Sequence, residues 1–88
     1  MTTGYRVYVL QNSKGKFYVG VTEDVAKRLA QHNAGGSQWT GGKGPWRLVW
    51  ESELLPLGAA RKLENRLKRQ GRGWGFYAIT GLNRTLGS

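Results

Sequence analysis

Hydrophobic and polar positions near the start of the chain alternate in a way that predicts a β-hairpin. Two runs, at 5–10 and 17–21, are rich in the β-branched and aromatic residues that strands favour. The segment between them, 11–16, is polar and contains asparagine and glycine, which are typical of a turn. Two such runs joined by a short polar turn predict two adjacent antiparallel strands.

The alternation also predicts which side chains share a face of the sheet. Successive side chains of a strand point to opposite faces, so Val7 and Val9 share one face and Tyr8 lies on the other. In the second run, Tyr18 and Gly20 share a face. If the register of the pair allows it, the two tyrosines project from the same side of adjacent strands.

A helical pattern follows the hairpin. We expect Thr22 to begin this helix, because its hydroxyl can cap free backbone amides and because Glu23 and Asp24 then complement the helix dipole. Asp24, Arg28 and His32 recur every four residues, so they are predicted to line one polar face. The apolar stripe at helical spacing consists of Val25, Ala26, Leu29 and Ala30.

The middle of the chain predicts a loop, a third strand and a second helix. Residues 33–44 include five glycines and are expected to form a loop. The strand, 46–51, follows Pro45, a residue tolerated at a strand entrance. The helix, 57–70, ends before Gly71, a common stop. Its buried stripe is predicted to be Ala60, Leu63 and Leu67, and its polar side to carry Arg61, Glu64 and Lys68.

The order of these elements, ββαβα, predicts the fold class. We expect an α/β (α+β) sandwich in which a three-stranded antiparallel sheet is flanked by helices. All 88 residues are assigned to one domain, with a core at about 5–80. Residues 74–79 are predicted to form either a short last helix or a strand, and 82–88 a loose tail.

Composition narrows the classes of protein. The chain has no cysteine and one histidine, which excludes disulfides, thiolate metal sites and an ordinary structural zinc site. No apolar run approaches the ~20 residues that a membrane-spanning helix needs. The first four residues have neither the basic nor the apolar region of a secretory signal, so the expected location is the cytoplasm.

Charge points to a polyanionic partner. Fourteen lysines and arginines face five acidic residues, a formal net charge of +9. Residues 54–88 hold seven of the basic residues but only one acid, Glu64. Nucleic acid is the usual partner of such a chain, and an anionic membrane surface is the competitor. We favour nucleic acid, because no segment sets a basic face opposite a wide apolar face rich in aromatics.

A set of spaced side chains adds candidate chemistry. Tyr8 and Tyr18 are ten residues apart, and Arg28 follows after ten more. His32 lies one helical turn beyond Arg28, and Glu64 is the one carboxylate of a basic helix. Together, two phenols, a guanidinium, an imidazole and a carboxylate have the chemistry to bind a metal ion and cut a phosphodiester.

This spacing resembles the GIY-YIG nuclease superfamily. Residues 6–8, Arg-Val-Tyr, stand where that family has Gly-Ile-Tyr, and residues 18–20, Tyr-Val-Gly, stand where it has Tyr-Ile-Gly. The resemblance runs from about residue 5 to about residue 69. It is closest to the small stand-alone bacterial members and to the N-terminal nuclease domain of UvrC.

The resemblance implies a metal-dependent endonuclease that hydrolyses phosphodiester bonds in nucleic acid, with DNA favoured. The cutting would be structure-selective or weakly selective, as in repair or recombination. One divalent cation, Mg²⁺ or Mn²⁺, would be held by Glu64 as its only protein ligand. Tyr8 would activate or position water, with Tyr18 and His32 assisting, and Arg28 would hold the phosphate. Next to a metal and cationic side chains, the pKa of a tyrosine is expected to fall below its usual value of about 10.

The same residues also have structural interpretations. Two tyrosines are ordinary residues of a hairpin. Arg28 can pair with Asp24 on an exposed helix face, and His32 can favour the helix dipole near a C-terminus. Glu64 can pair with Lys68, one turn away, and with an arginine three residues before it. The alternative function is therefore a catalytically weak nucleic-acid-binding module that retains the fold.

Further basic and aromatic side chains suit single strands or distorted junctions. Trp46 and Trp50 are expected in the core, whereas the glycine-rich loop around Trp39 is the better candidate for contacting substrate. Trp39 stands where many members of the family have tyrosine or histidine, and it cannot transfer a proton. Val21 stands where UvrC-like domains often have lysine. The residues predicted to bind nucleic acid are Lys43, Arg61, Arg66, Lys68, Arg69 and Trp39.

Overall fold

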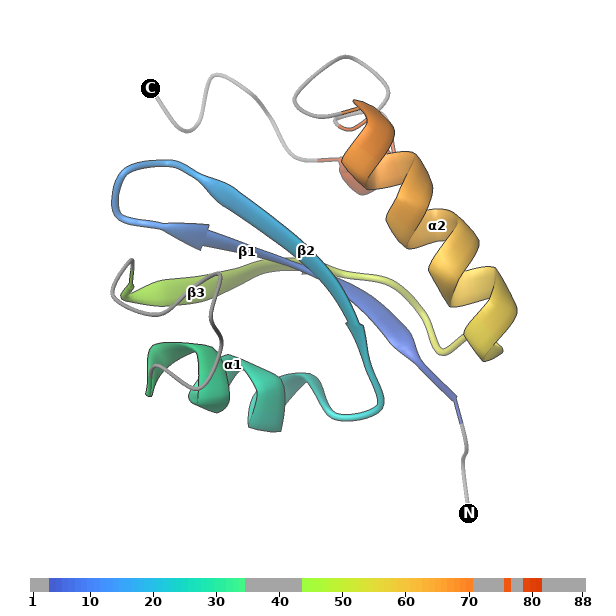
Figure 1. Ribbon diagram of the computed structural model, residues 1–88, viewed down its shortest axis with the longest axis horizontal. Coiled ribbons are helices and arrows are strands. Elements are labelled where there is room, and N and C mark those ends of the chain that lie inside the picture. The colour runs from blue at the N-terminus through green and yellow to red at the C-terminus, as the bar shows by residue number, and fades with distance from the viewer. Residues whose placement is uncertain (1–3, 35–43, 71–75, 77–78, 82–88) are drawn as a thin grey trace.

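A computed structural model of the chain describes residues 4–34, 44–70, 76 and 79–81. In this part of the chain, three strands form one antiparallel sheet and two helices pack against it (Figure 1). The predicted fold class and element order are therefore confirmed. The elements are β1 (Arg6–Asn12), β2 (Phe17–Thr22), α1 (Val25–Asn33), β3 (Trp46–Glu51) and α2 (Leu57–Gln70).

The central strand of the sheet is β1, and the strand order is β2-β1-β3. In the pairing of β1 with β2, Tyr8 lies opposite Gly20 and Leu10 lies opposite Tyr18. The two tyrosines therefore share a face, as the alternation predicted, and their ring centroids are 6.2 Å apart. The turn is closed by Asn12, whose Oδ1 accepts hydrogen bonds from the backbone amides of residues 14 and 16.

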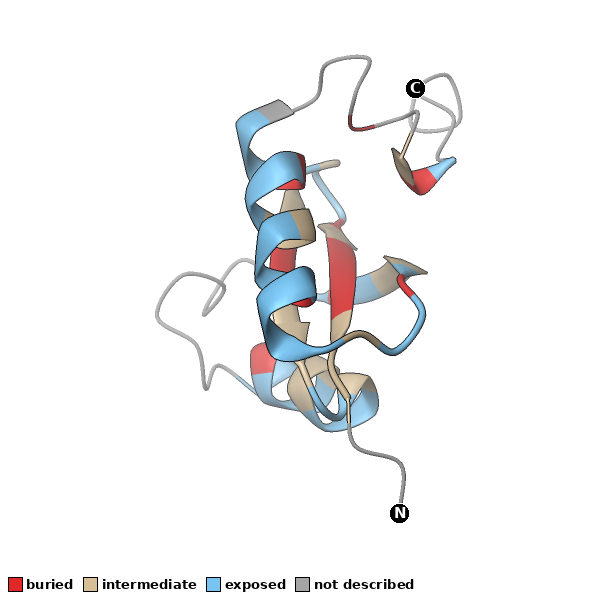
Figure 2. Cartoon of the chain, turned by 90° about the vertical axis from the view of Figure 1, so that its right-hand side faces the viewer, coloured by how far each residue is buried: buried red, intermediate tan, exposed pale blue. Residues whose placement is uncertain are grey.

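Two clusters of buried side chains lie on opposite faces of β1. Helix α2 packs on one cluster and α1 on the other. Full burial of a valine or leucine contributes roughly 1.5–3 kcal/mol relative to exposure. Figure 2 shows buried residues, in red, where α2 covers the sheet. The cluster beneath α2 contains Val7, Val9, Val19, Ala60, Leu67 and Phe76, and the cluster facing α1 contains Tyr8, Leu10 and Trp46, with Val25 and Leu29 packed against it.

The start of α1 differs from the prediction. Thr22 does not begin the helix, because its backbone pairs with Arg6 as the last residue of β2. The N-cap is Asp24, whose carboxylate accepts a hydrogen bond from the Lys27 amide at 3.1 Å. The Thr22 hydroxyl instead accepts from the Asp24 amide at 3.1 Å. Glu23 and Asp24 therefore precede the first turn, which contains no acidic residue.

The face that α1 presents to the sheet also differs from the prediction. Val25 and Leu29 pack against the sheet as expected, but Ala26 and Ala30 are exposed. His32 takes the inward position one turn on and is 1 % exposed. A helix this short has room for one narrow stripe against the sheet, and here an imidazole completes it.

The bounds predicted for the third strand and the second helix agree with β3 and α2. On α2, Ala60 and Leu67 are fully buried and Leu63 is partly buried, as the periodicity predicted. In the core, Trp46 is buried and Trp50 is partly buried against the α2-side cluster.

Several predictions about the fold fall wholly or partly outside the described residues. Most of the loop at 33–44 and all of the tail at 82–88 lie there, as does Gly71. In the segment 74–79, Phe76 and Ile79 are described, and both are helical, which favours the helical alternative there. None of the helices in the described part of the chain is long and apolar enough to cross a membrane.

Candidate active site

A cavity of about 430 Å³ lies where the edge strand β2 meets the two helices. It brings together four of the five residues predicted to carry the chemistry, from β1, β2, α1 and α2. The wall also contains side chains that the sequence analysis did not select, because only the sheet order and helix placement bring them here. The lining residues are Tyr5, Tyr8, Tyr18, Gly20, Val21, Arg28, Leu57, Arg61 and Glu64.

The position of Tyr8 depends on the glycine opposite it. The Tyr8 ring lies across β2 at Gly20, and a Cβ added there would be 2.5 Å from the phenol oxygen. No larger residue fits at position 20 without moving the Tyr8 hydroxyl. Although Tyr8 lines the cavity, its side chain is almost fully buried, with 1 % of its surface exposed.

His32 lies behind the tyrosines rather than on an exposed polar face. Its Nε2 is 2.9 Å from the Tyr8 hydroxyl oxygen, in a buried hydrogen bond. The Tyr18 ring centroid is 4.7 Å from the imidazole. Burial, followed by the positive charge of Arg28, lowers the pKa of His32 below its ordinary value of 6.5. The imidazole is therefore neutral near neutral pH, and Nε2 can accept the Tyr8 proton.

In the protein alone, the pKa of Tyr8 is raised, whereas the predicted lowering applies to a tyrosine beside a bound metal ion. Burial raises the pKa of Tyr8 above the ordinary value of 10.0, and this outweighs the lowering by Arg28. Tyr18 raises it further, because a second ionised phenol nearby is unfavourable. In the protein alone, Tyr8 is therefore a neutral phenol at physiological pH. The Tyr8 hydroxyl can position a water molecule, but the phenol ionises near neutral pH only if a further positive charge, such as a metal ion, lies beside it.

The lowered pKa of His32 gives an expected pH dependence of stability. An unfolded chain protonates this imidazole near pH 6.5, whereas the folded protein resists protonation until lower pH. Acidification from about pH 7.5 to about pH 5.5 should therefore lower the free energy of unfolding, because the unfolded state binds the proton more tightly. Stability contributed by neutral His32 is complete above this window and is lost as the pH falls.

The check uses the fact that the chain has one histidine. The imidazole Hε1 resonance of this histidine should show a titration midpoint below 6.5 by NMR, and denaturant unfolding at both ends of the window should give the stability change. A midpoint at or above 6.5 would contradict the burial argument. In His32→Gln the fall in stability across this window should shrink.

Arg28 is partly buried and lies beside both phenols. Its Nη1 donates a hydrogen bond to Gln31 Oε1 at 2.8 Å, and Tyr8 raises the pKa of the guanidinium. In the described part of the chain Arg28 makes no ion pair with Asp24, whose carboxylate caps the helix. The geometry therefore does not support the surface-pair interpretation, and the planar group lines the cavity.

Glu64 supplies the carboxylate of the cavity from α2. Its side chain is 20 % exposed, and Oε2 lies 3.1 Å from Lys68 Nζ, the pair expected one turn away. Among the described residues no group of three or more His, Cys, Asp or Glu is arranged to hold a metal ion. A hard divalent cation can still bind one carboxylate when water and phosphate oxygens complete its six ligands. Glu64 in an open cavity fits that donor set.

The predicted nucleic-acid-binding residues divide into two groups. Arg61 lines the cavity, while Arg66, Lys68 and Arg69 are exposed on α2. Lys68 and Arg69 also line a shallow cavity of about 320 Å³ together with Asn65. The positions of Lys43 and Trp39 lie outside the described residues.

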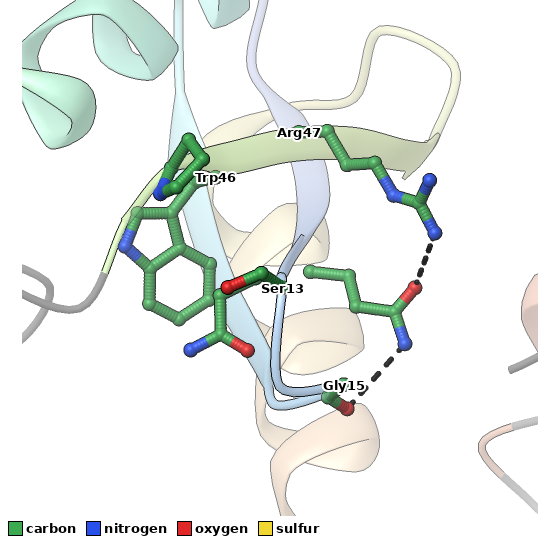
Figure 3. Close-up of a pocket in the computed structure, with 7 residues that line it drawn as sticks. Ser13, Gly15, Trp46 and Arg47 are labelled. Atoms are coloured by element: carbon green, nitrogen blue, oxygen red, sulfur yellow. Dashed lines mark hydrogen bonds between the residues drawn. The ribbon is translucent and has the colours of Figure 1, made fainter.

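Another cavity, of about 390 Å³, lies at the far end of the hairpin (Figure 3). Arg47 Nη2 donates to Gln11 Oε1 at 3.1 Å, and Gln11 Nε2 donates to the carbonyl of Gly15 at 3.4 Å. Trp46 forms another part of its wall. None of the predicted site residues is among the described residues that line this cavity.

The fold and the cavity define a small α+β domain whose paired tyrosines face an arginine and a glutamate. A family model described as the GIY-YIG catalytic domain matches residues 4–76. The chain belongs to the GIY-YIG family, a nuclease family, as its two tyrosine motifs predicted.

Among curated proteins, the chain is similar to several called UPF0213 protein. It is 37 % identical over 81 residues to one from Aeromonas hydrophila, covering 91 % of this chain and 60 % of that protein. It is 41 % identical over 69 residues to one from Aeromonas salmonicida (77 % and 51 %). For one from Yersinia pestis the identity is 44 % over 66 residues (74 % and 70 %). The chain thus spans 60 % and 51 % of the lengths of the two Aeromonas relatives.

A solved structure supports the same placement. The solution NMR structure of a UPF0213 protein from Bacillus halodurans superimposes with a TM-score of 0.51 at 34 % sequence identity. The match covers 80 % of this chain and 76 % of that protein. The name UPF0213 specifies neither an activity nor a metal.

Proposed function

We propose that this protein is a metal-dependent endonuclease that hydrolyses phosphodiester bonds in nucleic acid, with DNA the favoured substrate. The observation that carries the proposal is the cavity in which Tyr8, Tyr18, Arg28 and Glu64 meet from four separate elements. A structural role for each residue alone would not require this convergence. Membership of a nuclease family supports the same chemistry.

Arg28 holds the scissile phosphate. Its planar guanidinium matches two phosphate oxygens and keeps its charge at every physiological pH. That charge offsets the negative charge that grows on the phosphate oxygens as the new bond forms. The hydrogen bond from Arg28 to Gln31 limits the rotation of the arginine side chain, so less conformational entropy is lost when Arg28 binds the phosphate.

Tyr8 and His32 handle the proton of the attacking water. The Tyr8 hydroxyl accepts a hydrogen bond from water while it donates its own proton to Nε2 of the neutral imidazole. The relay explains how a phenol with a raised pKa takes part without being ionised in the resting protein. Tyr18, 6.2 Å from Tyr8 between ring centroids, packs beside it and keeps the ring in place.

Glu64 would hold a single Mg²⁺ or Mn²⁺ ion, and the bound ion would supply the positive charge that stabilises the leaving oxygen. One carboxylate gives weak affinity until substrate phosphate contributes its oxygens. Arg61, in the same wall, adds positive charge next to the phosphate. We further propose a structure-selective or weakly selective enzyme of DNA repair or recombination that acts in the cytoplasm.

A catalytically weak binding module is the second candidate, and two observations favour it. The pKa of Tyr8 is raised, and the carboxylate of Glu64 is engaged by Lys68. The test is incubation of the protein with branched, single-stranded and duplex DNA in Mg²⁺ or Mn²⁺, with a chelator control. We expect nicking that stops on chelation. Tight binding with no nicking in either metal would favour the binding module instead.

Binding to nucleic acid should weaken steeply with salt. The cause is the net charge of +9 and the basic face of α2, which release counterions from each phosphate that they contact. About three phosphate contacts on duplex DNA give a log–log slope near −2.7, or roughly 40-fold weaker binding between 50 and 200 mM salt. Fluorescence anisotropy with a labelled duplex measures the slope, and a value near zero would show that phosphate contacts do not dominate.

A further inference from the structure

The carboxylate of the cavity already has a cationic partner on its own helix. Lys68 Nζ lies 3.1 Å from Glu64 Oε2, with the lysine side chain 53 % exposed and the glutamate 20 % exposed. The neighbouring lysine on α2, Lys62, makes no ion pair with any residue that the structure describes. Lys68 is therefore distinguished from an ordinary lysine of this basic helix by the group that it contacts.

An ammonium ion and a divalent cation compete for one carboxylate. The ammonium group at this distance occupies one oxygen of Glu64, and its charge repels a second cation nearby. A cation that binds Glu64 through Oε2 or through both oxygens must therefore displace Lys68, at the cost of breaking the pair. For a pair that is partly exposed, this cost weakens metal binding by about twofold to fivefold.

Lys68 also lies beside a second surface that its ammonium group can contact after displacement. Its side chain also lines the shallow cavity beside Asn65 and Arg69, on the exposed surface of α2. Among the described residues of that lining, every charged one is basic, so a displaced ammonium there meets positive charge unless an anion is present. A phosphate of bound nucleic acid supplies such an anion, since lysine binds phosphate as a flexible point charge.

We propose that Lys68 is a positioning residue that exchanges partners during substrate binding. It holds the Glu64 carboxylate in the metal-free protein, is displaced by the divalent cation, and then binds a substrate phosphate next to the cut site. The inference rests on the proposed role of Glu64 as the metal ligand. By linkage, nucleic acid that engages Lys68 raises the affinity for metal, and metal raises the affinity for nucleic acid by the same factor.

The test measures metal binding without measuring cleavage. Mn²⁺ is titrated at low salt into the wild type, Lys68→Met and Lys62→Met, and paramagnetic broadening of the backbone amide signals of residues 63–65 gives the affinity at Glu64. Methionine keeps much of the apolar stem and removes the charge. Lys62 is about 200° around the helix from Glu64, so its variant controls for net charge. We expect Lys68→Met to bind Mn²⁺ about twofold to fivefold more tightly than the wild type, with Lys62→Met unchanged.

A second arm tests the exchange of partners. Addition of a short phosphorothioate DNA that resists cleavage should raise the Mn²⁺ affinity of the wild type more than that of Lys68→Met. Equal Mn²⁺ affinity of all three proteins would overturn the proposal. So would an equal gain in Mn²⁺ affinity in Lys68→Met and Lys62→Met, or an equal effect of the DNA on the wild type and on Lys68→Met. Broadening around residue 64 that persists in Glu64→Gln would instead overturn the metal assignment, so the two failures are distinguishable.

Discussion

Replacement of Glu64 by glutamine should reduce cleavage by about 10³-fold or more, while nucleic-acid binding measured without divalent metal stays near the wild-type level. Glutamine keeps the volume of the side chain but removes the negative charge that a hard cation requires. The loss should be the same in Mg²⁺ and Mn²⁺, and raising the metal concentration should not restore the rate. Binding persists because Glu64 repels phosphate, and its neutralisation leaves the basic groups of α2 in place.

The matched control is Glu53→Gln, which makes the same chemical change at an exposed residue outside the cavity. Its cleavage rate should equal that of the wild type. Thermal unfolding of both variants reports the structural effect, which should be small for Glu64, because its only ion pair in the described part of the chain is with partly exposed Lys68. Cleavage by Glu64→Gln at the wild-type rate would eliminate the metal role.

Replacement of Arg28 by lysine should reduce the cleavage rate by about 10²-fold although the charge is preserved. A lysine offers a point charge on a flexible chain, so two-point contact with the phosphate is lost. It also cannot fill the same space beside the phenol of Tyr8, whose pKa Arg28 lowers. The measurement is single-turnover cleavage with protein in excess, which isolates the chemical step from substrate binding and product release.

A second arginine provides a close control. Arg47, like Arg28, donates a guanidinium hydrogen bond to a glutamine side chain, but it lies at the far end of the hairpin. Arg47→Lys should keep the cleavage rate under saturating protein and should change stability by a similar small amount. If Arg28→Lys and Arg47→Lys cleave equally well, Arg28 has no catalytic role, and its contacts within α1 are structural only.

Prediction from the sequence succeeded where the deciding interactions are local. The alternation around Val7, Tyr8 and Val9 predicted the two faces of β1, and the register Tyr8 to Gly20 agrees with it. The bounds of α2 agree with the prediction from the sequence. The start of α1 was wrong, because Thr22 and Asp24 are both good caps and the pairing of Thr22 with Arg6 decides between them.

The electrostatic state of the site could not be predicted in the same way. His32 was expected on a polar face, and the pKa of Tyr8 was expected to fall. The expectation for His32 was wrong, and burial raises the pKa of Tyr8 in the protein without metal, because desolvation depends on every atom within several ångströms, and those atoms belong to β1, β2, α1 and β3. No spacing along the chain encodes how deeply a phenol and an imidazole are buried together.

The sequence by itself therefore determined the elements, the side of the sheet on which each tyrosine lies, and the residue types available for chemistry. Periods of two and of 3.6 residues express these properties in short segments. Only the tertiary structure decided that Glu64 of α2 lines one cavity with Tyr8 and Arg28, and that Lys68 occupies its carboxylate. Those facts depend on how α2 packs across the sheet from α1, which is set by burial of two separate clusters rather than by any local pattern.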